Sequence, residues 1–269
     1  MERAPSILAQ GLSITSDGQT DVAYDVPNET AVAVSVNGNT HAVMMATPQH
    51  LRDFAIGFAL TEGILTDTDQ IRSLDIIDHP NGVEAQFWLT DETAQPFLAR
   101  RRAMAGPVGC GLCGIDSLDQ AVRTLPRVGD DTAHFPADQI VSACDELQRQ
   151  QPLHDVTHGV HAAGFLTRDH GITIVREDVG RHNALDKLIG ALRQSGVDPA
   201  TGAIVLTSRV SVEMVQKTAL AGCGMIIAVS TPTSHALDLA QSANITLCAI
   251  TRSGRTVCFA HPHRLEGNS

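Results

Sequence analysis

Apolar and polar residues alternate in two pairs of short segments in the first third of the chain. Residues 31–46, AVAVSVNGNTHAVMMA, have the pattern of two strands joined across the turn 37–39, where Asn and Gly tolerate positive φ. Residues 74–78 and 83–89 form a second alternating pair around an Asn-Gly dipeptide. The pattern therefore predicts two β-hairpins.

Between these hairpins the apolar spacing changes to that of a helix. Apolar residues recur every three or four positions between residues 51 and 58. Thr47 followed by Pro48 is typical of an N-cap and a first helical residue, so we predict an amphipathic helix that begins there and ends near Gly63. A further helix is predicted through the arginines at 100–102. The first half of the chain is thus mixed α and β.

From about residue 159 short apolar strands alternate with helices of about three turns. The predicted strands are 161–166, 171–178, 202–208, 224–230 and 245–250, and the predicted helices are 181–195, 211–222 and 234–243. Helices between successive strands require crossover connections, which place the strands they join parallel. The second half therefore predicts an α/β sheet with helices on its faces.

The changes of pattern divide the chain into three parts. Residues 1–28 are polar and predict an extended lead-in that does not fold alone. Residues 29–135 form an N-terminal α+β part that carries a cysteine-rich loop, and residues 136–269 form a C-terminal α/β part. A chain of 269 residues, 43% of them hydrophobic, is long enough for one large or two modest domains with a sizeable core.

Charge and hydropathy exclude several classes of function. The formal net charge of -11 argues against a nucleic-acid partner, because such binding needs a basic surface. Nothing in the sequence reaches the roughly 18 consecutive apolar residues of a membrane span, and the N-terminus lacks the pattern of a signal peptide. We therefore expect a cytoplasmic protein without a membrane partner, whose six cysteines are not a disulfide framework.

The segment GCGLCG places Cys110 and Cys113 in a CxxC spacing with glycine beside each cysteine. Two sulfurs at this spacing can share a metal, form a disulfide or pass a sulfur atom between them. Glycine removes side-chain cover and permits positive φ, so the thiols can lie where another molecule reaches them. The chemistry of the protein is expected here.

A metal site and thiol–disulfide exchange are the alternatives to sulfur transfer at this pair. The other cysteines lie apart in apolar patterns and are expected in the core: Cys144, Cys223, Cys248 and Cys258. A zinc ribbon therefore lacks its second CxxC. Three histidines near the domain junction could complete a metal site: His154, His158 and His161. Such histidines more often lie at the surface, so no tightly held metal is expected. A zinc deaminase needs HxE before PCxxC, which this chain lacks. Thiol–disulfide exchange stays open as the second chemical alternative.

The segments that follow four predicted strands combine small, hydroxyl and cationic residues. They are 178–183, 208–211, 230–234 and 251–255. Carboxyl ends of parallel strands meet at one edge, and three of these segments run into helix N-termini, which favour anions. Their arginines, which suit a phosphorylated ligand, are Arg181, Arg209, Arg252 and Arg255. The sequence thus favours a nucleotide or pyrophosphate crevice.

Two observations limit this interpretation. Neither GxxxxGK[ST] nor GxGxxG is present, which argues against a P-loop nucleotidase or a simple dinucleotide-dependent oxidoreductase. Arg181, His182 and Arg209 are candidate phosphate partners because of their positions at strand ends. They could equally cap helices or pair with Asp178 and Glu213, in which case the loops would be ordinary helix starts.

Sulfur carriage uses both the thiol pair and the crevice, and here the chain resembles a known family. The motifs that carry the resemblance are HAVMMATP, FAIGFALTEGI, GCGLCG, REDVGRHNALDKL, TSRVSVEMVQK and SGRTVCFAHPHRL. In this order they are similar to the formate dehydrogenase accessory sulfurtransferase family, from Glu29 to Leu265. The resemblance implies a protein that takes sulfur from a cysteine desulfurase. It also implies that the acceptor is the bis-molybdopterin guanine dinucleotide form of the molybdenum cofactor of formate dehydrogenases.

The resemblance also assigns roles to residues of this chain. It implies that Cys110 carries the persulfide and that Cys113 is the second cysteine of the pair. The implied cofactor-binding residues are Ile250, Thr251, Arg252, Ser253, Gly254 and Arg255. The implied fold is a cytidine-deaminase-like α/β/α sandwich with a mixed, partly parallel sheet and a smaller α+β N-terminal part, and the implied assembly is a homodimer. A cofactor-binding chaperone without sulfur transfer is the alternative of a different class.

Overall fold

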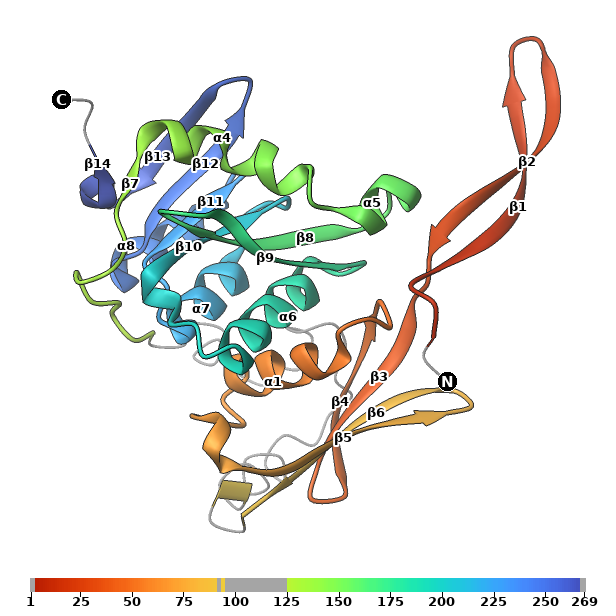
Figure 1. The fold of residues 1–269 in the computed structure, drawn as a ribbon, viewed down its shortest axis with the longest axis horizontal. Helices are drawn as coiled ribbons and strands as arrows, with labels where there is room; N and C mark the ends of the chain where they lie inside the picture. The colour runs from red at the N-terminus through yellow and green to blue at the C-terminus, as the bar shows by residue number, and fades with distance from the viewer. Residues whose placement is uncertain (1–2, 91–92, 95–124, 267–269) are drawn as a thin grey trace.

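A computed structural model of the chain describes residues 3–90, 93–94 and 125–266. The pair Cys110 and Cys113 and the helix predicted through residues 100–102 lie outside the described residues. Figure 1 shows two α/β bodies, with a two-stranded arm that extends away from both.

The N-terminal body contains a four-stranded sheet in the order β4-β3-β6-β5. Its strands are β3 (Thr30–Val36), β4 (Asn39–Ala46), β5 (Ile71–His79) and β6 (Gly82–Leu89). Both predicted hairpins are confirmed, since β3 pairs antiparallel with β4 and β5 pairs antiparallel with β6. β3 and β6 run parallel in the middle, which makes this sheet mixed.

Helix α1 (Leu51–Thr61) covers this sheet with an apolar face that includes the buried Phe54 and Phe58. The predicted start of the helix at Thr47 is wrong, because the N-cap position belongs to His50, whose φ is 54°. Thr47 has the sequence of a cap, but its backbone and hydroxyl bind the C-terminal body instead. Tertiary hydrogen bonds have taken the place of local capping.

The C-terminal body is built on a six-stranded sheet in the order β13-β12-β11-β10-β8-β9. Its strands are β8 (His161–Thr167), β9 (Gly171–Asp178), β10 (Gly202–Leu206), β11 (Met225–Ala228), β12 (Thr246–Arg252) and β13 (Arg255–Ala260). β10, β11 and β12 pair in parallel, whereas β8, β9 and β13 pair antiparallel with their neighbours. β9 points the same way as β10, because both are antiparallel to β8 between them. Four strands therefore end at one edge, within the predicted mixed α/β class.

Helices cover both faces of this sheet (Figure 1). The three predicted helices all lie on one face: α6 (Arg181–Gln194), α7 (Val212–Ala221) and α8 (Ser234–Ala243). The other face carries α4 (Ala137–Gln148), and α5 (Pro152–Thr157) leads from α4 into β8. Short elements complete the fold: η1 (Thr68–Gln70), β7 (Phe135–Pro136), η2 (Pro199–Thr201), η3 (Pro262–Arg264) and β14 (Leu265–Glu266). A separate apolar core fills each side of the sheet.

The arm is a hairpin of β1 (Ser6–Thr15) and β2 (Gly18–Pro27), which pair along their whole length. The sequence predicted the first strand only after residue 28, so the arm has more regular structure than expected. Large apolar side chains lie exposed on it, with Ile14 at 72% exposure. An isolated pair of strands buries too little apolar surface to show a one-sided core pattern, so the sequence of this segment did not indicate two strands.

The two bodies meet where α1 crosses α6, and glycine makes the crossing possible. A Cβ atom on Gly57 would lie 1.8 Å from the carbonyl oxygen of Asp186, and one on Gly190 would lie 1.9 Å from the carbonyl oxygen of Asp53. The helix backbones are therefore in direct contact, each through a glycine of its own. α1 is buried on one side by its sheet and on the other by α6.

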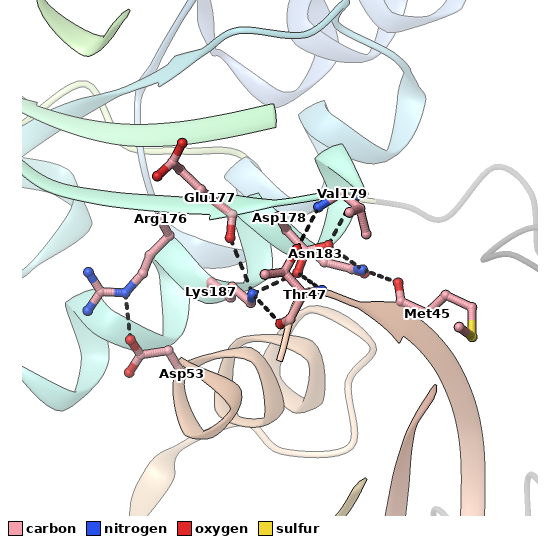
Figure 2. Close-up of polar contacts among 10 residues, drawn as sticks. Met45, Thr47, Asp53, Arg176, Glu177, Asp178, Val179, Asn183 and Lys187 are labelled. Carbon is pink, nitrogen blue, oxygen red and sulfur yellow. Dashed lines mark hydrogen bonds and ion pairs between the residues drawn. The ribbon is translucent and has the colours of Figure 1, made fainter. Parts of the chain in front are cut away.

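Beside this crossing, Thr47 of the N-terminal body is hydrogen-bonded to a buried ion pair of the C-terminal body (Figure 2). Lys187 Nζ lies 2.7 Å from Asp178 Oδ2, and both side chains are fully buried. The ammonium also donates to the carbonyl oxygens of Thr47, at 2.9 Å, and Glu177, at 3.2 Å. Thr47 in turn donates its N–H to Asp178 Oδ2 at 3.0 Å and accepts from the N–H of Val179 at 3.1 Å. We call Thr47, Asp178 and Lys187 the joint.

Further polar contacts extend the attachment on both sides of the joint. Asn183 Nδ2 donates to the carbonyl oxygen of Met45 at 2.8 Å and to Asp178 Oδ1 at 3.0 Å (Figure 2). Lys217 Nζ lies 2.9 Å from both carboxylate oxygens of Asp186 and donates to Thr61 Oγ1, also at 2.9 Å. Burial of so many charges is tolerated because each has several partners.

We predict that Gly57→Ala destabilises the protein by about 3 kcal/mol, because the added methyl group cannot fit against the backbone of Asp186. Helix propensity alone predicts the opposite sign, since alanine is favoured over glycine within a helix. Urea denaturation followed by circular dichroism measures the change. Gly129→Ala is the control, since its new Cβ would meet nothing nearer than 4.0 Å. An unchanged or raised stability of Gly57→Ala would contradict the packing at the crossing.

We predict that Lys187→Met lowers the free energy of unfolding by about 3 kcal/mol or more, because the carboxylate of Asp178 stays buried without its counter-ion. The double variant Lys187→Met with Asp178→Asn should lose less than the two single losses together. The same denaturation experiment on the wild type, both single variants and the double variant measures this coupling. Strictly additive losses would show that the ion pair does not form.

Candidate functional site

The loops that leave the carboxyl ends of β10, β11 and β12 are joined to one another by backbone hydrogen bonds. The N–H of Val210 donates to the carbonyl oxygen of Thr231 at 3.3 Å, and the N–H of Thr233 donates back to Val210 at 3.0 Å. The N–H of Ile250 donates to the carbonyl oxygen of Ser230 at 3.4 Å. These loops, together with residues 178–183 after β9, form a continuous edge that we call the rim.

The segment 250–255 lies at one end of the rim and has an unusual backbone. Ile250 has φ of 57°, a conformation that is costly for a β-branched residue, and it interrupts the register between β12 and β13. Ser253 and Gly254, with φ of 54° and 70°, make the tight turn between the paired Arg252 and Arg255.

Within this segment the side chains divide into a buried and an exposed group. Thr251 is buried, and its hydroxyl lies 2.8 Å from the hydroxyl of Thr256. Arg252, Ser253, Gly254 and Arg255 are exposed, as is Arg209 in the neighbouring loop. The rim thus presents three guanidinium groups to solvent along the ends of β10 and β12.

Arg181 and His182 lie at the N-terminus of α6, and the structure gives them different surroundings. The Nε atom of Arg181 is buried without a hydrogen-bond partner among the described residues. His182 Nε2 lies 3.8 Å from Glu213 Oε2. The interaction with His182, followed by the hydrogen bond from Ser211, lowers the pKa of Glu213 to about 2. His182 Nε2, like Arg181 Nε, is thus a buried nitrogen without a hydrogen-bond partner among the described residues, at the point where the starts of α6 and α7 meet.

A cavity of about 440 Å³ opens beside the rim on the α4 side of the sheet. Its lining comes from α4, α5, the start of β8 and the ends of β10 and β11: Cys144, Gln148, Gln151, His154, His158, Gly159, Val160, His161, Thr207 and Val229. Gln151 is only 2% exposed, and its Nε2 has no hydrogen-bond partner among the described residues. A buried amide without a partner is costly, so its donor is suited to a ligand.

The surroundings of the cavity histidines fix their protonation and their positions. Burial, followed by the positive charge of Arg181, lowers the pKa of His161, so its imidazole is neutral near pH 7. Glu177 accepts hydrogen bonds from the N–H groups of Leu153, at 2.9 Å, and His154, at 2.8 Å, which fixes the start of α5. The rings of His154 and His158 meet edge to face with centroids 5.5 Å apart.

Cys144 connects the cavity to the segment 250–255. Burial raises the pKa of the Cys144 thiol to about 12, and the nearby Thr251 hydroxyl opposes this shift only in part. The thiol is therefore protonated at neutral pH and serves packing. Among the described residues no group of three or more His, Cys, Asp or Glu side chains is arranged to hold a metal ion.

The predicted site residues that the structure describes thus lie along one edge rather than in one pocket. Four strand spacings, about 19 Å across the sheet, separate the ends of β12 and β9, so Arg252 and Arg181 lie toward opposite ends of the rim. The cavity lies between these ends. Sequence reasoning weighed His154, His158 and His161 only for a metal and did not select Gln151 or Thr207. These residues come from separate elements, and no periodicity in the sequence connects them.

The chain is similar to known proteins over most of its length. Among the described residues, no helix is long and apolar enough to cross a membrane. The chain is 48% identical over 240 residues to a protein of Agrobacterium fabrum that is named sulfur carrier protein FdhD. It is 47% identical over 242 residues to a protein of the same name from Cupriavidus necator. The first match covers 89% of each chain, and the second covers 90% of this chain and 84% of the relative.

The structure comparison and the family comparison agree. A crystal structure of a putative formate dehydrogenase accessory protein from Desulfotalea psychrophila is 25% identical, with a TM-score of 0.76. It is matched over 98% of this chain and 100% of that one. The FdhD/NarQ family model matches residues 27–266, which include every described element except β1 and most of β2. This chain belongs to the FdhD/NarQ family.

Proposed function

We propose that this protein is a sulfur carrier, with sulfurtransferase activity, that serves the maturation of formate dehydrogenase. The observation that carries the proposal is the rim, where exposed guanidinium groups flank a cavity that contains the unpartnered amide nitrogen of Gln151. The names of the relatives from Agrobacterium fabrum and Cupriavidus necator support sulfur carriage. The similarity to the accessory protein from Desulfotalea psychrophila supports the link to formate dehydrogenase.

The proposed chemistry begins at Cys110. Its thiolate attacks the outer sulfur of a persulfide on a cysteine desulfurase, which forms a persulfide on Cys110 and releases the desulfurase cysteine as a thiolate. Cys113 then attacks the inner sulfur, forms a disulfide with Cys110 and releases hydrosulfide to the acceptor. A cellular dithiol reduces the disulfide and restores the pair. Both electrons that convert persulfide sulfur to sulfide thus come from the thiol pair.

The acceptor is the bis-molybdopterin guanine dinucleotide cofactor, bound as substrate at the rim. Arg252 and Arg255, with Arg209, would bind its pyrophosphate oxygens, since guanidinium groups match phosphate geometry. The backbone of residues 250–255 could approach the same phosphate groups, because Gly254 and Ser253 leave it little covered by side chains. Inside the cavity, the amide of Gln151 and the neutral imidazole of His161 offer hydrogen bonds to a base. Arg181 lies beside them as a further phosphate partner.

The finer architecture follows from the same proposal. We propose a cytidine-deaminase-like sandwich for the C-terminal part, residues 136–269, and a cysteine loop carried by the N-terminal part, residues 29–135. A cytoplasmic homodimer would present two equivalent rims, one for each guanine nucleotide of the cofactor. The joint would fix the distance between the thiol-bearing part and the rim within each subunit.

We predict that incubation with a cysteine desulfurase and cysteine adds one reducible sulfur to the protein, and that peptide mass spectrometry locates it on Cys110. Cys110→Ala should abolish the added mass. Cys113→Ala should keep it, because only release depends on the second thiol. Absence of added sulfur from folded wild-type protein would favour the alternative, a cofactor-binding chaperone. A Cys110–Cys113 disulfide without persulfide would favour thiol–disulfide exchange.

We predict that guanosine diphosphate binds the full chain and that Arg255→Gln weakens this binding about tenfold, because a charge-assisted hydrogen bond to phosphate is lost. Isothermal titration calorimetry at constant salt measures the dissociation constants. Arg72→Gln is the matched control, since Arg72 is an exposed arginine on β5 of the other body. Equal weakening by both variants would show that only net charge matters and that 250–255 is not the phosphate site.

A further inference from the structure

Two cysteines outside the predicted thiol pair are direct neighbours across the sheet. Cys248 on β12 pairs with Cys258 on β13 in the antiparallel register. Residues opposite each other in such a pair project from the same face of a sheet. Both side chains accordingly pack in the core between the sheet and α4. Cys223, by contrast, packs in the core on the opposite side of the sheet.

The pairing brings these two thiols within the reach of a disulfide. Opposed residues of antiparallel strands have Cα atoms about 4.5 or 5.5 Å apart, depending on their hydrogen-bonding type. Both values fall within the range that disulfides span. Both side chains lie in the same apolar core, so the two thiols are neighbours, and the Cys258 thiol donates to the carbonyl oxygen of Ala260 at 3.3 Å. The register shifts next to Cys248, where β13 has an extra residue, and such a bulge bends and twists the strand locally.

The two thiols have unequal environments. Cys248 is fully buried, whereas Cys258 is partly exposed on β13, the edge strand of the sheet. The neighbouring thiol of Cys248 lowers the pKa of Cys258, which favours the thiolate form of Cys258. The same thiol contact, followed by burial, raises the pKa of Cys248. One cysteine is thus a nucleophile and the other a protonated neighbour.

The remaining described cysteines lack these features. Burial raises the pKa of Cys144 to about 12 and that of Cys223 to about 11. Neither is paired with another cysteine among the described strand registers. Reactivity at Cys258 therefore follows from its place in the fold rather than from residue type.

We infer that Cys258 and Cys248 form a second reactive dithiol, which exchanges with low-molecular-weight disulfides and closes an intramolecular disulfide. The thiolate of Cys258 attacks one sulfur of the external disulfide, forms a mixed disulfide and releases one thiolate. Cys248 then loses its proton, attacks the Cys258 sulfur and releases the second thiolate. The protein dithiol gives up two electrons, and the external disulfide is reduced to two thiols.

The position of this dithiol connects it to the segment 250–255. Cys248 lies two residues before Ile250, and Cys258 lies two residues after Thr256, whose hydroxyl contacts that of Thr251. A disulfide would close the base of the turn that presents Arg252 and Arg255. The inference rests on the strand pairing and on the unequal burial of the two thiols, so it stands or fails independently of sulfur transfer.

We predict that oxidised glutathione at neutral pH links Cys258 to Cys248 in the full chain carrying Cys110→Ala and Cys113→Ala. Trypsin cleaves after Arg252 and Arg255, so the disulfide appears in non-reducing mass spectrometry as peptide 218–252 joined to peptide 256–264. Before oxidation, iodoacetamide should alkylate Cys258 at least tenfold faster than Cys144. Circular dichroism confirms that the protein stays folded throughout.

Matched variants identify the partners. Cys248→Ser should stop at a glutathione adduct on Cys258, because the resolving thiol is missing. Cys258→Ser should leave Cys248 unmodified, because that thiol is buried. Cys223→Ser should still give the linked peptides. Absence of the link in folded protein, persistence of the link in Cys248→Ser, or alkylation of Cys258 no faster than Cys144 would overturn the inference.

Discussion

The arrangement of the whole molecule depends on one buried ion pair, Lys187 with Asp178, and on the backbone of Thr47 that both of them bind. A charge in an apolar core is tolerated only when its partners are fixed, so this pair fixes the relation of two bodies that have separate cores. The glycine contact between α1 and α6 allows the elements to come close enough for these hydrogen bonds. The close packing of α1 on α6 and the hydrogen bonds of the buried ion pair therefore depend on each other.

The same ion pair places the first loop of the rim. Asp178 is the last residue of β9, and its second oxygen accepts from the N–H of Gly180 at 2.8 Å, just before α6 begins. The start of α6 therefore has a fixed position relative to the N-terminal body, and with it Arg181 and His182. Hydrogen bonds between the remaining loops carry this position along the sheet to Ile250. A site spread over four strand ends gains precision in this way from a single anchored corner.

Much of this fold could be predicted, and the failures have physical causes. Both N-terminal hairpins and the alternating strands and helices of the second half follow from apolar periodicity, because each element buries one face or both. The arm was missed although Asp17-Gly18 is a common hairpin dipeptide, since its strands show no buried face. The early start given to α1 failed because Thr47 makes its hydrogen bonds with Asp178 and Val179. The rim was predictable from strand ends, whereas the cavity with Gln151 depends on how α4 and α5 pack.

The cysteines show most directly how position decides chemistry. Sequence patterns placed Cys144, Cys223, Cys248 and Cys258 together as core residues, and burial supports that description for the first three. Cys258 differs only because β13 is an edge strand and because its neighbour across the ladder is another thiol. Alternation of apolar residues along one strand cannot reveal a partner on the next, since register is set by the turn and by the bulge at Cys248. A residue's reactivity in this protein is therefore a property of strand pairing, which becomes visible only when the sheet is assembled.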